Sequence, residues 1–167
     1  MNNPQYQEFL KDVNAHINIV HKVCRVYCPG HLEAEREDVF QEIMFQLWRS
    51  YPHFKGQSKF STWMYKVALN TAITYVKKSA RNPATEKLRP THDFAETTGP
   101  NPEDEKLSLL YEAIDSLSPL DKAIILLYLE DNSYQEIAMI IGLTKTNVSV
   151  RLVRIKKALE ERLRYTD

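Results

Sequence analysis

Residues 133–159 read SYQEIAMIIGLTKTNVSVRLVRIKKAL, and this stretch predicts two helices joined by a tight turn. Ser133 followed by Glu136 is typical of a helix start at which each side chain bonds the backbone of the other residue. Gly142 permits the left-handed backbone that ends a short helix, and Thr144 can cap a second helix. The stretch therefore predicts a helix-turn-helix.

The second helix of this pair, running to about Leu159, has one apolar face and one mixed face. Val148, Leu152 and Ile155 recur at helical spacing and predict the buried side. The opposite side carries Thr146, Val150, Val153, Arg154 and Lys157. A reader of the major groove needs such a mixture, because arginine contacts guanine edges or phosphate and aliphatic groups contact thymine methyls. The alternative, an ordinary helical hairpin with a solvated basic face, leaves the exposed valines unexplained.

The chain divides where its prolines gather. Half of the eight prolines lie within residues 81–106: Pro83, Pro90, Pro100 and Pro102. Because proline disrupts helix interiors, we expect residues 81–106 to be a flexible linker between domains of residues 1–80 and 107–167. Apolar residues in both domains recur at helical spacing, without alternation of period two. The predicted fold is therefore all-α, with two small helical domains.

The charges of this chain cancel in number but not in position. The sequence has 22 basic and 22 acidic residues, yet residues 43–85 and residues 137–159 contain no acid. The acids gather at residues 33–42 and 93–105. Because the local field attracts phosphate, the sequence predicts two separate basic surfaces.

A helix expected over residues 38–49 has an outward face suited to another protein. Val39, Ile43 and Leu47 form its apolar stripe. The residues left outside are Asp38, Gln41, Glu42 and Phe45, with Trp48 at the edge. An exposed aromatic among acids suggests docking against a partner's helix that carries basic groups. The alternative is a solvated acidic face with one stray aromatic.

A basic loop and a further helix follow. Residues 53–60, HFKGQSKF, contain two aromatics, and Ser61 can cap a helix that reaches Lys78. One face of that helix carries Trp63, Lys66, Asn70, Thr74 and Lys77. Aromatic rings, cations and amides without acids suit single-stranded DNA, in which bases stack and amides read base edges. The alternative for Trp63 is a core anchor that packs the loop.

These motifs together resemble the extracytoplasmic-function sigma factors of bacterial RNA polymerase, over nearly the whole chain. EDVFQE at residues 37–42, followed by Phe45 and Trp48, is similar to the family's segment that binds core polymerase. FKG at 54–56 and FSTWMYKVALN at 60–70 resemble its segment that melts and reads the −10 element. SYQEIA at 133–138, with Gly142, Val148, Arg151 and Leu152, resembles its −35-reading helix-turn-helix.

The resemblance implies three sets of contact residues, named here for later use. The polymerase set is Asp38, Gln41, Glu42, Phe45 and Trp48. The −10 set is Phe54, Lys55, Ser58, Phe60, Ser61, Thr62, Trp63, Lys66, Asn70 and Lys77. The −35 set is Lys145, Thr146, Ser149, Val150, Arg151, Val153, Arg154 and Lys157. Residues 1–80 would then be sigma region 2, and residues 107–167 sigma region 4.

The resemblance also implies partners. The first domain would dock on the β′ clamp helices of core RNA polymerase and the second on the β flap, with promoter DNA bound by both. A linker of residues 81–106 reaches about 86 Å when extended, whereas two helical turns of DNA span roughly 70 Å. The usual inhibitor would be a membrane-associated anti-sigma factor that holds the chain at the inner face of the membrane. The family often has Arg or Lys where this chain has Ser149, and Ser where it has Val150. These two departures allow a different preferred −35 sequence.

Other classes of function explain fewer features of the sequence. No paired carboxylates, activated nucleophile or phosphate-binding glycine loop points to an enzyme or a small-molecule substrate. His21, Cys24, Cys28 and His31 form a metal-like string, but Pro29 and Gly30 break the helix before His31. We therefore expect a buried helix there, and no metal or cofactor.

A stand-alone helix-turn-helix regulator that binds duplex DNA as a dimer is the remaining alternative. It explains residues 133–159 but gives Phe45, Phe60 and Trp63 no task. Two cysteines, a polar N-terminus and no long apolar run favour a reducing cytoplasm.

Overall fold

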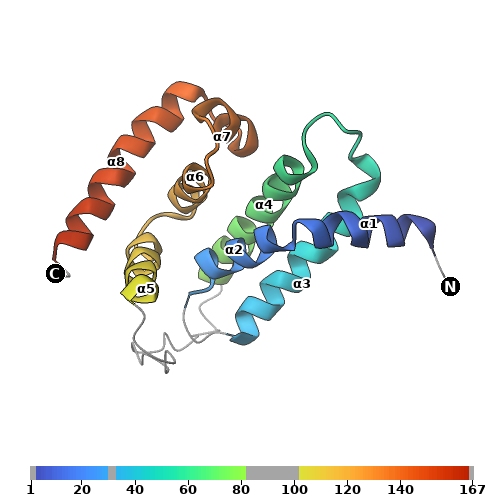
Figure 1. The fold of residues 1–167 in the computed structure, drawn as a ribbon, viewed down its shortest axis with the longest axis horizontal. Coiled ribbons are helices and arrows are strands. Elements are labelled where there is room, and N and C mark those ends of the chain that lie inside the picture. The colour runs from blue at the N-terminus through green and yellow to red at the C-terminus, as the bar shows by residue number, and fades with distance from the viewer. Residues whose placement is uncertain (1–2, 30–32, 82–101, 166–167) are drawn as a thin grey trace.

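The computed structural model describes residues 3–29, 33–81 and 102–165, and every regular element in these ranges is helical (Figure 1). The N-terminal domain contains α1 (Pro4–Ala15), α2 (Ile17–Tyr27), α3 (Glu33–Ser50), the short 3-10 helix η1 (Tyr51–His53) and α4 (Phe60–Ala80). The C-terminal domain contains α5 (Pro102–Asp115), α6 (Pro119–Leu129), α7 (Tyr134–Ile141) and α8 (Lys145–Arg164). The expected all-α fold of two small domains is confirmed.

The caps of the helix-turn-helix form as its sequence predicts. The Glu136 amide donates to Ser133 Oγ at 3.1 Å, and the Ser133 amide donates to Glu136 Oε2 at 2.8 Å. Gly142 ends α7 with a φ of 80°, in the left-handed region. The Asn147 amide then donates to Thr144 Oγ1 at 3.1 Å, which caps the start of α8. These bonds satisfy backbone groups that the helix ends would otherwise leave unpaired.

Three helix ends differ from expectation. Ser61 does not cap α4, which begins two residues earlier than expected, at Phe60, with Lys59 as a cap that forms no side-chain bond. Helix α8 runs past Leu159 to Arg164. Helix α5 begins at Pro102, so residues 102–106 of the expected linker are helical, while residues 82–101 lie outside the described ranges. Proline fits the first turn of a helix, where its missing amide is not needed, and the acids at residues 103–105 favour the positive end of the helix dipole.

The N-terminal core forms where α2 and α3 pack against α4. The apolar stripe predicted from the sequence, Val39, Ile43 and Leu47, is buried there. Helix α4 contributes Met64, Ala68 and Ala72, and all six residues are fully inaccessible to solvent. Helix α2 adds Val20 and Val23 to the same core. This packing fixes which faces of α3 and α4 remain outside.

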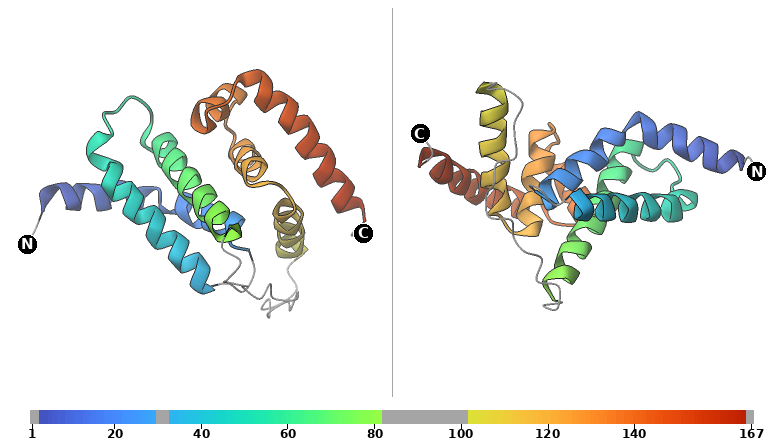
Figure 2. Two further views of the ribbon diagram at one scale, coloured as in Figure 1. Left: turned by 180° about the vertical axis from the view of Figure 1, so that it is seen from behind. Right: turned by 90° about the horizontal axis from the view of Figure 1, so that it is seen from below.

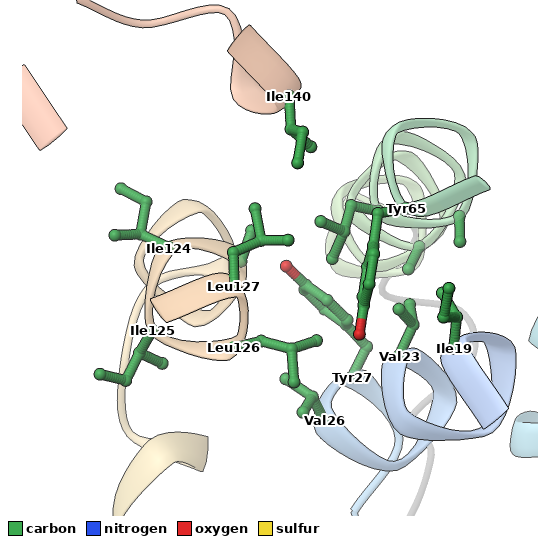
Figure 3. Close-up of a cluster of buried hydrophobic side chains, with 14 of the residues drawn as sticks. Ile19, Val23, Val26, Tyr27, Tyr65, Ile124, Ile125, Leu126, Leu127 and Ile140 are labelled. Atoms are coloured by element: carbon green, nitrogen blue, oxygen red, sulfur yellow. The ribbon is translucent and has the colours of Figure 1, made fainter. Parts of the chain in front are cut away.

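The two domains also pack against one another. Helices α2 and α4 contact α6, and further contacts join α2 to α5 and α4 to α7, as the views in Figures 1 and 2 agree. Figure 3 draws the centre of this contact, where Val26, Tyr27 and Tyr65 approach Leu126 and Leu127. The buried side chains of both domains therefore form one continuous cluster.

Candidate nucleic-acid and partner interfaces

Helix α3 presents an acidic face that bears one exposed aromatic. Asp38, Gln41 and Glu42 are exposed on it, and Phe45 retains 56% of its accessible surface. Since the opposite face is locked into the core, these four members of the polymerase set share one accessible surface. The Gln46 amide donates to Glu42 Oε1 at 3.1 Å along the same helix.

Trp48, the fifth member of the polymerase set, is differently placed. It is half-buried, and its ring meets Tyr6 and Phe9 edge-on, with centroids 5.2 and 5.0 Å away. Trp48 therefore joins α3 to α1 and lies at the border of the acidic face. Its aromatic partners on α1 come from a part of the chain that the spacing along α3 could not reveal.

The aromatics of the −10 set pack on one another where α4 begins. Ring centroids are 5.5 Å apart for Phe54 and Phe60, 5.1 Å for Phe54 and Trp63, and 5.3 Å for Phe60 and Trp63. All three are half-buried. Trp63 thus helps to hold the loop in place, as the core-anchor alternative requires, and still keeps part of its surface open. We call these three residues the aromatic cluster.

Tyr51 packs against the aromatic cluster. Its ring centroid lies 6.4 Å from that of Trp63 and 6.5 Å from that of Phe60. Its hydroxyl donates to Asp12 Oδ2 at 2.8 Å, which ties η1 to α1. Burial and then the bond to Asp12 raise the pKa of Tyr51 to about 12. Sequence spacing gave no sign of this residue, because Asp12 and Tyr51 are far apart in the chain.

Polar members of the −10 set lie in the loop before α4 and along α4 itself. Lys55, Ser58, Lys66, Asn70 and Lys77 are exposed, and Ser61 and Thr62 are half-buried. With no acid between residues 43 and 85, nothing in this stretch opposes the approach of phosphate. The result is a set of rings at one end of α4 and cations and an amide along its outer face.

Helix α8 projects the mixed face predicted from its sequence. Lys145, Thr146, Arg154 and Lys157 are exposed, together with Val150 at 45% and Val153 at 67% of their accessible surface. Ser149 is half-buried. Val148, Leu152, Ile155 and Leu159 are buried on the opposite side. Aliphatic groups exposed among cations and a hydroxyl can contact both base edges and phosphates of duplex DNA.

Arg151 is the exception in the −35 set. Its Nη1 lies 3.0 Å from Asp121 Oδ1 at the start of α6, and its side chain is 38% exposed. Arg151 therefore braces α8 against α6, whereas Arg154 has an open position on the outward side. Asp121 was not among the expected site residues, because its pairing with Arg151 joins two different helices.

The metal-like string in α2 forms part of the core. Cys24 and Cys28 are buried, and burial raises the pKa of Cys24 to about 11, which keeps the thiol protonated at neutral pH. Across residues 3–29, 33–81 and 102–165, no three His, Cys, Asp or Glu side chains are grouped to hold a metal ion. His31 lies outside these residues. In the same ranges, no helix combines the length and the apolarity that crossing a membrane requires.

Two family models match this chain. Residues 13–82 match the family model of sigma-70 region 2, and residues 107–159 match that of sigma-70, region 4. The ECF RNA polymerase sigma-E factor of Haemophilus influenzae is 32% identical over 75% of this chain and 73% of its own length. That of Escherichia coli strain K12 is 30% identical over 86% of this chain and 81% of its own length.

Two solved structures share the fold. The sigma factor RpoE of Bartonella quintana, in complex with the anti-sigma factor NepR, superposes with a TM-score of 0.65 at 22% identity, over 95% of this chain and 96% of its own. CnrH in complex with the cytosolic domain of CnrY gives a TM-score of 0.68 at 18% identity, over 97% of this chain and 91% of its own. The matches of both sigma-70 regions and of the two sigma-E relatives show that this chain belongs to the extracytoplasmic-function sigma factors of bacterial RNA polymerase.

Proposed function

We propose that this chain binds core RNA polymerase, brings it to promoters by their −10 and −35 elements, and initiates transcription there without catalytic activity of its own. Residues 1–80 would act as region 2 and residues 107–167 as region 4. The observation that carries this proposal is the presence of three exposed surfaces with different chemistry on one chain. They are the acidic face of α3, the aromatic cluster with its cations, and the mixed face of α8.

Region 2 supplies polymerase binding and strand opening in this proposal. The acidic face of α3, with the exposed Phe45 at its C-terminal end, offers charge and apolar area to the β′ clamp helices. Lys55, Lys66 and Lys77 attract the DNA backbone towards α4. Bases freed from the duplex then stack on the open edges of the aromatic cluster, and Asn70 can bond a base edge.

Region 4 supplies recognition of the closed −35 duplex. Arg154 carries a planar fork of donors that can grip a guanine edge, and Val150 and Val153 can contact thymine methyls. Lys157 lies one turn further along α8, where it can neutralise phosphate. The same domain would dock on the β flap, so that both DNA-binding surfaces face the promoter from one polymerase.

An anti-sigma factor is the proposed regulator. Two solved relatives of the same fold are complexes with anti-sigma factors, NepR and the cytosolic domain of CnrY. We infer that this chain also works in the cytoplasm, under a membrane-associated anti-sigma factor that covers its polymerase-binding surfaces. This regulation predicts that polymerase and inhibitor compete for the chain.

A gel shift on promoter DNA with and without core polymerase tests the proposal. The chain should form a promoter complex that depends on core polymerase, and run-off transcription should need both. A regulator that acts alone would shift duplex DNA without polymerase.

A double variant tests the docking face. Replacing Asp38 and Phe45 together with Ala should lower affinity for core polymerase in a pull-down while helical content is unchanged, because both side chains are exposed. The matched control replaces an exposed acid and an exposed aromatic of α8 and its cap, Glu161 and Tyr165, with Ala. Equal affinities of the two double variants would remove the docking role of α3.

A further inference from the structure

The loop before α4, residues 54–59, is held at its two ends and open at its tip. At its first end, the Phe54 amide donates to the carbonyl oxygen of Tyr51 at 3.1 Å. At the tip, Gly56 has a φ of 72°, and a Cβ added there would meet no heavy atom of the described residues within 4 Å, chain neighbours aside. The positions of the two ends therefore decide where the loop presents its exposed Lys55.

Tyr51 fixes the first end of the loop, and α1 fixes Tyr51. Helix α1 passes close to the end of α3 (Figure 1), where the ring centroids of Phe9 and Tyr51 are 5.2 Å apart. The Tyr51 hydroxyl donates to Asp12 Oδ2 at 2.8 Å. The other side of this ring packs against Phe60 and Trp63. The Asp12 carboxylate thus orients a ring that touches two members of the aromatic cluster.

His16 approaches the second end of the loop. Its ring centroid lies 5.8 Å from that of Phe60, at an interplanar angle of 35°. His16 is exposed and is the residue at which α1 ends and α2 begins. Asp12 and His16 are four residues apart, so both contacts come from one place, which we call the α1–α2 elbow. The elbow therefore touches a ring at each end of the loop.

The aromatic cluster requires support from outside because it cannot be buried on all sides. Its three rings are half-buried, and their open edges are what an unpaired base would stack on. Apolar contact has no preferred direction, whereas a hydrogen bond does. Burial and then the bond to Asp12 raise the pKa of Tyr51 to about 12, so the hydroxyl is protonated and donates at neutral pH. The bond between Tyr51 and Asp12 therefore adds an orientation that ring packing alone does not supply.

We propose that Asp12, Tyr51 and His16 are positioning residues for capture of the opened −10 strand. They hold the loop and the aromatic cluster in the shape in which an unpaired base can stack. This inference deepens the proposed function as a sigma factor and rests on it. Asp12 acts through Tyr51 and not on the DNA, since a carboxylate repels phosphate. A loop already held in its binding shape loses less conformational entropy when the strand binds.

Holoenzyme binding to two DNAs tests the role of Tyr51. One is a promoter fork whose −10 bases are unpaired, and the other is the closed promoter duplex. Tyr51→Phe keeps the ring and removes the hydroxyl, so it should weaken binding to the fork about fivefold by lowering the population of the ordered loop. Affinity for the closed duplex and for core polymerase should stay within about twofold of the parent values, because the −35 and polymerase sets are untouched. Tyr6→Phe, at an exposed site on α1, is the control.

Variants of Asp12 separate positioning from general packing. Asp12→Ala should weaken fork binding as much as Tyr51→Phe does. Asp12→Asn should restore it to within about twofold of the parent, because the amide oxygen can still accept from the Tyr51 hydroxyl. The double variant Asp12→Ala with Tyr51→Phe should lose no more than either single variant, since each removes the same bond.

A matched pair of histidines tests the other contact of the elbow. His16→Ala should weaken fork binding about threefold, because it removes a ring pair at Phe60. His16→Phe should restore the affinity, since it keeps a ring at this position. His21→Ala is the control: His21 is also exposed and stacks on Phe40 of α3, with centroids 5.1 Å apart, and neither residue belongs to a contact set.

The outcomes distinguish this inference from the function on which it rests. Parental fork affinity of Tyr51→Phe, equal losses on the fork and the closed duplex, or failure of Asp12→Asn to restore binding would each overturn the positioning role. Circular dichroism identifies a variant that does not fold, and the Asp12→Asn and His16 variants then decide. If the parent binds neither DNA in a manner that depends on core polymerase, the proposed function fails, and this inference fails with it.

Discussion

The two DNA-facing surfaces of this chain are built in opposite ways. At the start of α4, Phe54, Phe60 and Trp63 pack on one another and on Tyr51, so the surface is also part of the domain's packing. On α8, Val150 and Val153 project from a helix whose opposite side forms the core. In the first surface the same residues therefore serve both DNA binding and the stability of the domain, whereas in the second surface the two roles fall to different residues.

Truncating one residue of each surface gives the largest expected contrast. Trp63→Ala should lower the free energy of unfolding by about 3 kcal/mol, because it opens a gap among packed rings. Val153→Ala, at a site 67% exposed, should change it by less than about 0.5 kcal/mol. Urea unfolding followed by circular dichroism measures both. Equal losses would mean that the two surfaces are not built differently.

The second-largest expected effect is a loss of stability of the N-terminal domain at alkaline pH. Burial raises the pKa of Cys24 from 9.0 to about 11 and, with the bond to Asp12, that of Tyr51 from 10.0 to about 12. Burial also raises the pKa of Tyr27 and Tyr65. These groups hold protons more tightly when folded, so their contribution to stability is fully present below pH 9 and is lost as pH rises through 11 and 12.

Tryptophan fluorescence reports this loss selectively, because Trp48 and Trp63, the two tryptophans of the chain, both lie in the N-terminal domain. Urea midpoints measured by fluorescence should fall between pH 9 and 11. Cys24→Ala should reduce that fall, since it removes a group that titrates there. A midpoint that stays constant over this range would contradict the expected linkage.

The −35 surface should reveal its sequence preference through Arg154. Arg154→Ala should cost about 1 to 3 kcal/mol on the preferred −35 sequence and flatten discrimination at one or two base positions. Arg151→Ala is the matched control, because its guanidinium pairs with Asp121. Binding of holoenzyme to a library of single-base changes separates the two. If Arg154→Ala keeps the parental preference among −35 sequences, Arg154 contacts only phosphate.

Lys157 should give the smallest effect. Lys157→Ala should weaken binding to all −35 sequences alike and lower the slope of log affinity against log salt by about 0.9, the value for one phosphate contact. A titration of the holoenzyme at several salt concentrations measures the slope. A change confined to one base position would show that Lys157 reads sequence.

Local signals in the sequence predicted most of the fold. Ser133, Glu136, Gly142 and Thr144 act on backbone groups a few residues away, so their pattern suffices to predict the helix-turn-helix. The stripe of Val39, Ile43 and Leu47 likewise repeats with the helix itself. Such features depend on neighbours in the chain and can be read without knowing the tertiary structure.

Contacts between distant segments could not be predicted in this way. The family resemblance placed Arg151 with the groove readers, but only the packing of α6 against α8 brings Asp121 to its guanidinium. Trp48 was expected at a partner's surface, and α1 supplies Tyr6 and Phe9 to its ring. Helix α4 was expected to start after a cap at Ser61, but it starts at Phe60, whose ring belongs to the aromatic cluster. Tertiary contacts set these positions.

The continuous core across both domains has a consequence for synthesis of the chain. Ribosomes add about 5 to 20 residues per second, so residues 107–167 appear about 3 to 12 s after the N-terminal domain has emerged. Helical domains with local contacts fold within milliseconds. During those seconds the nascent N-terminal domain bears an uncovered apolar patch around Val26, Tyr27 and Tyr65. A chaperone could bind this patch only during synthesis, before the C-terminal domain of the same chain covers the patch.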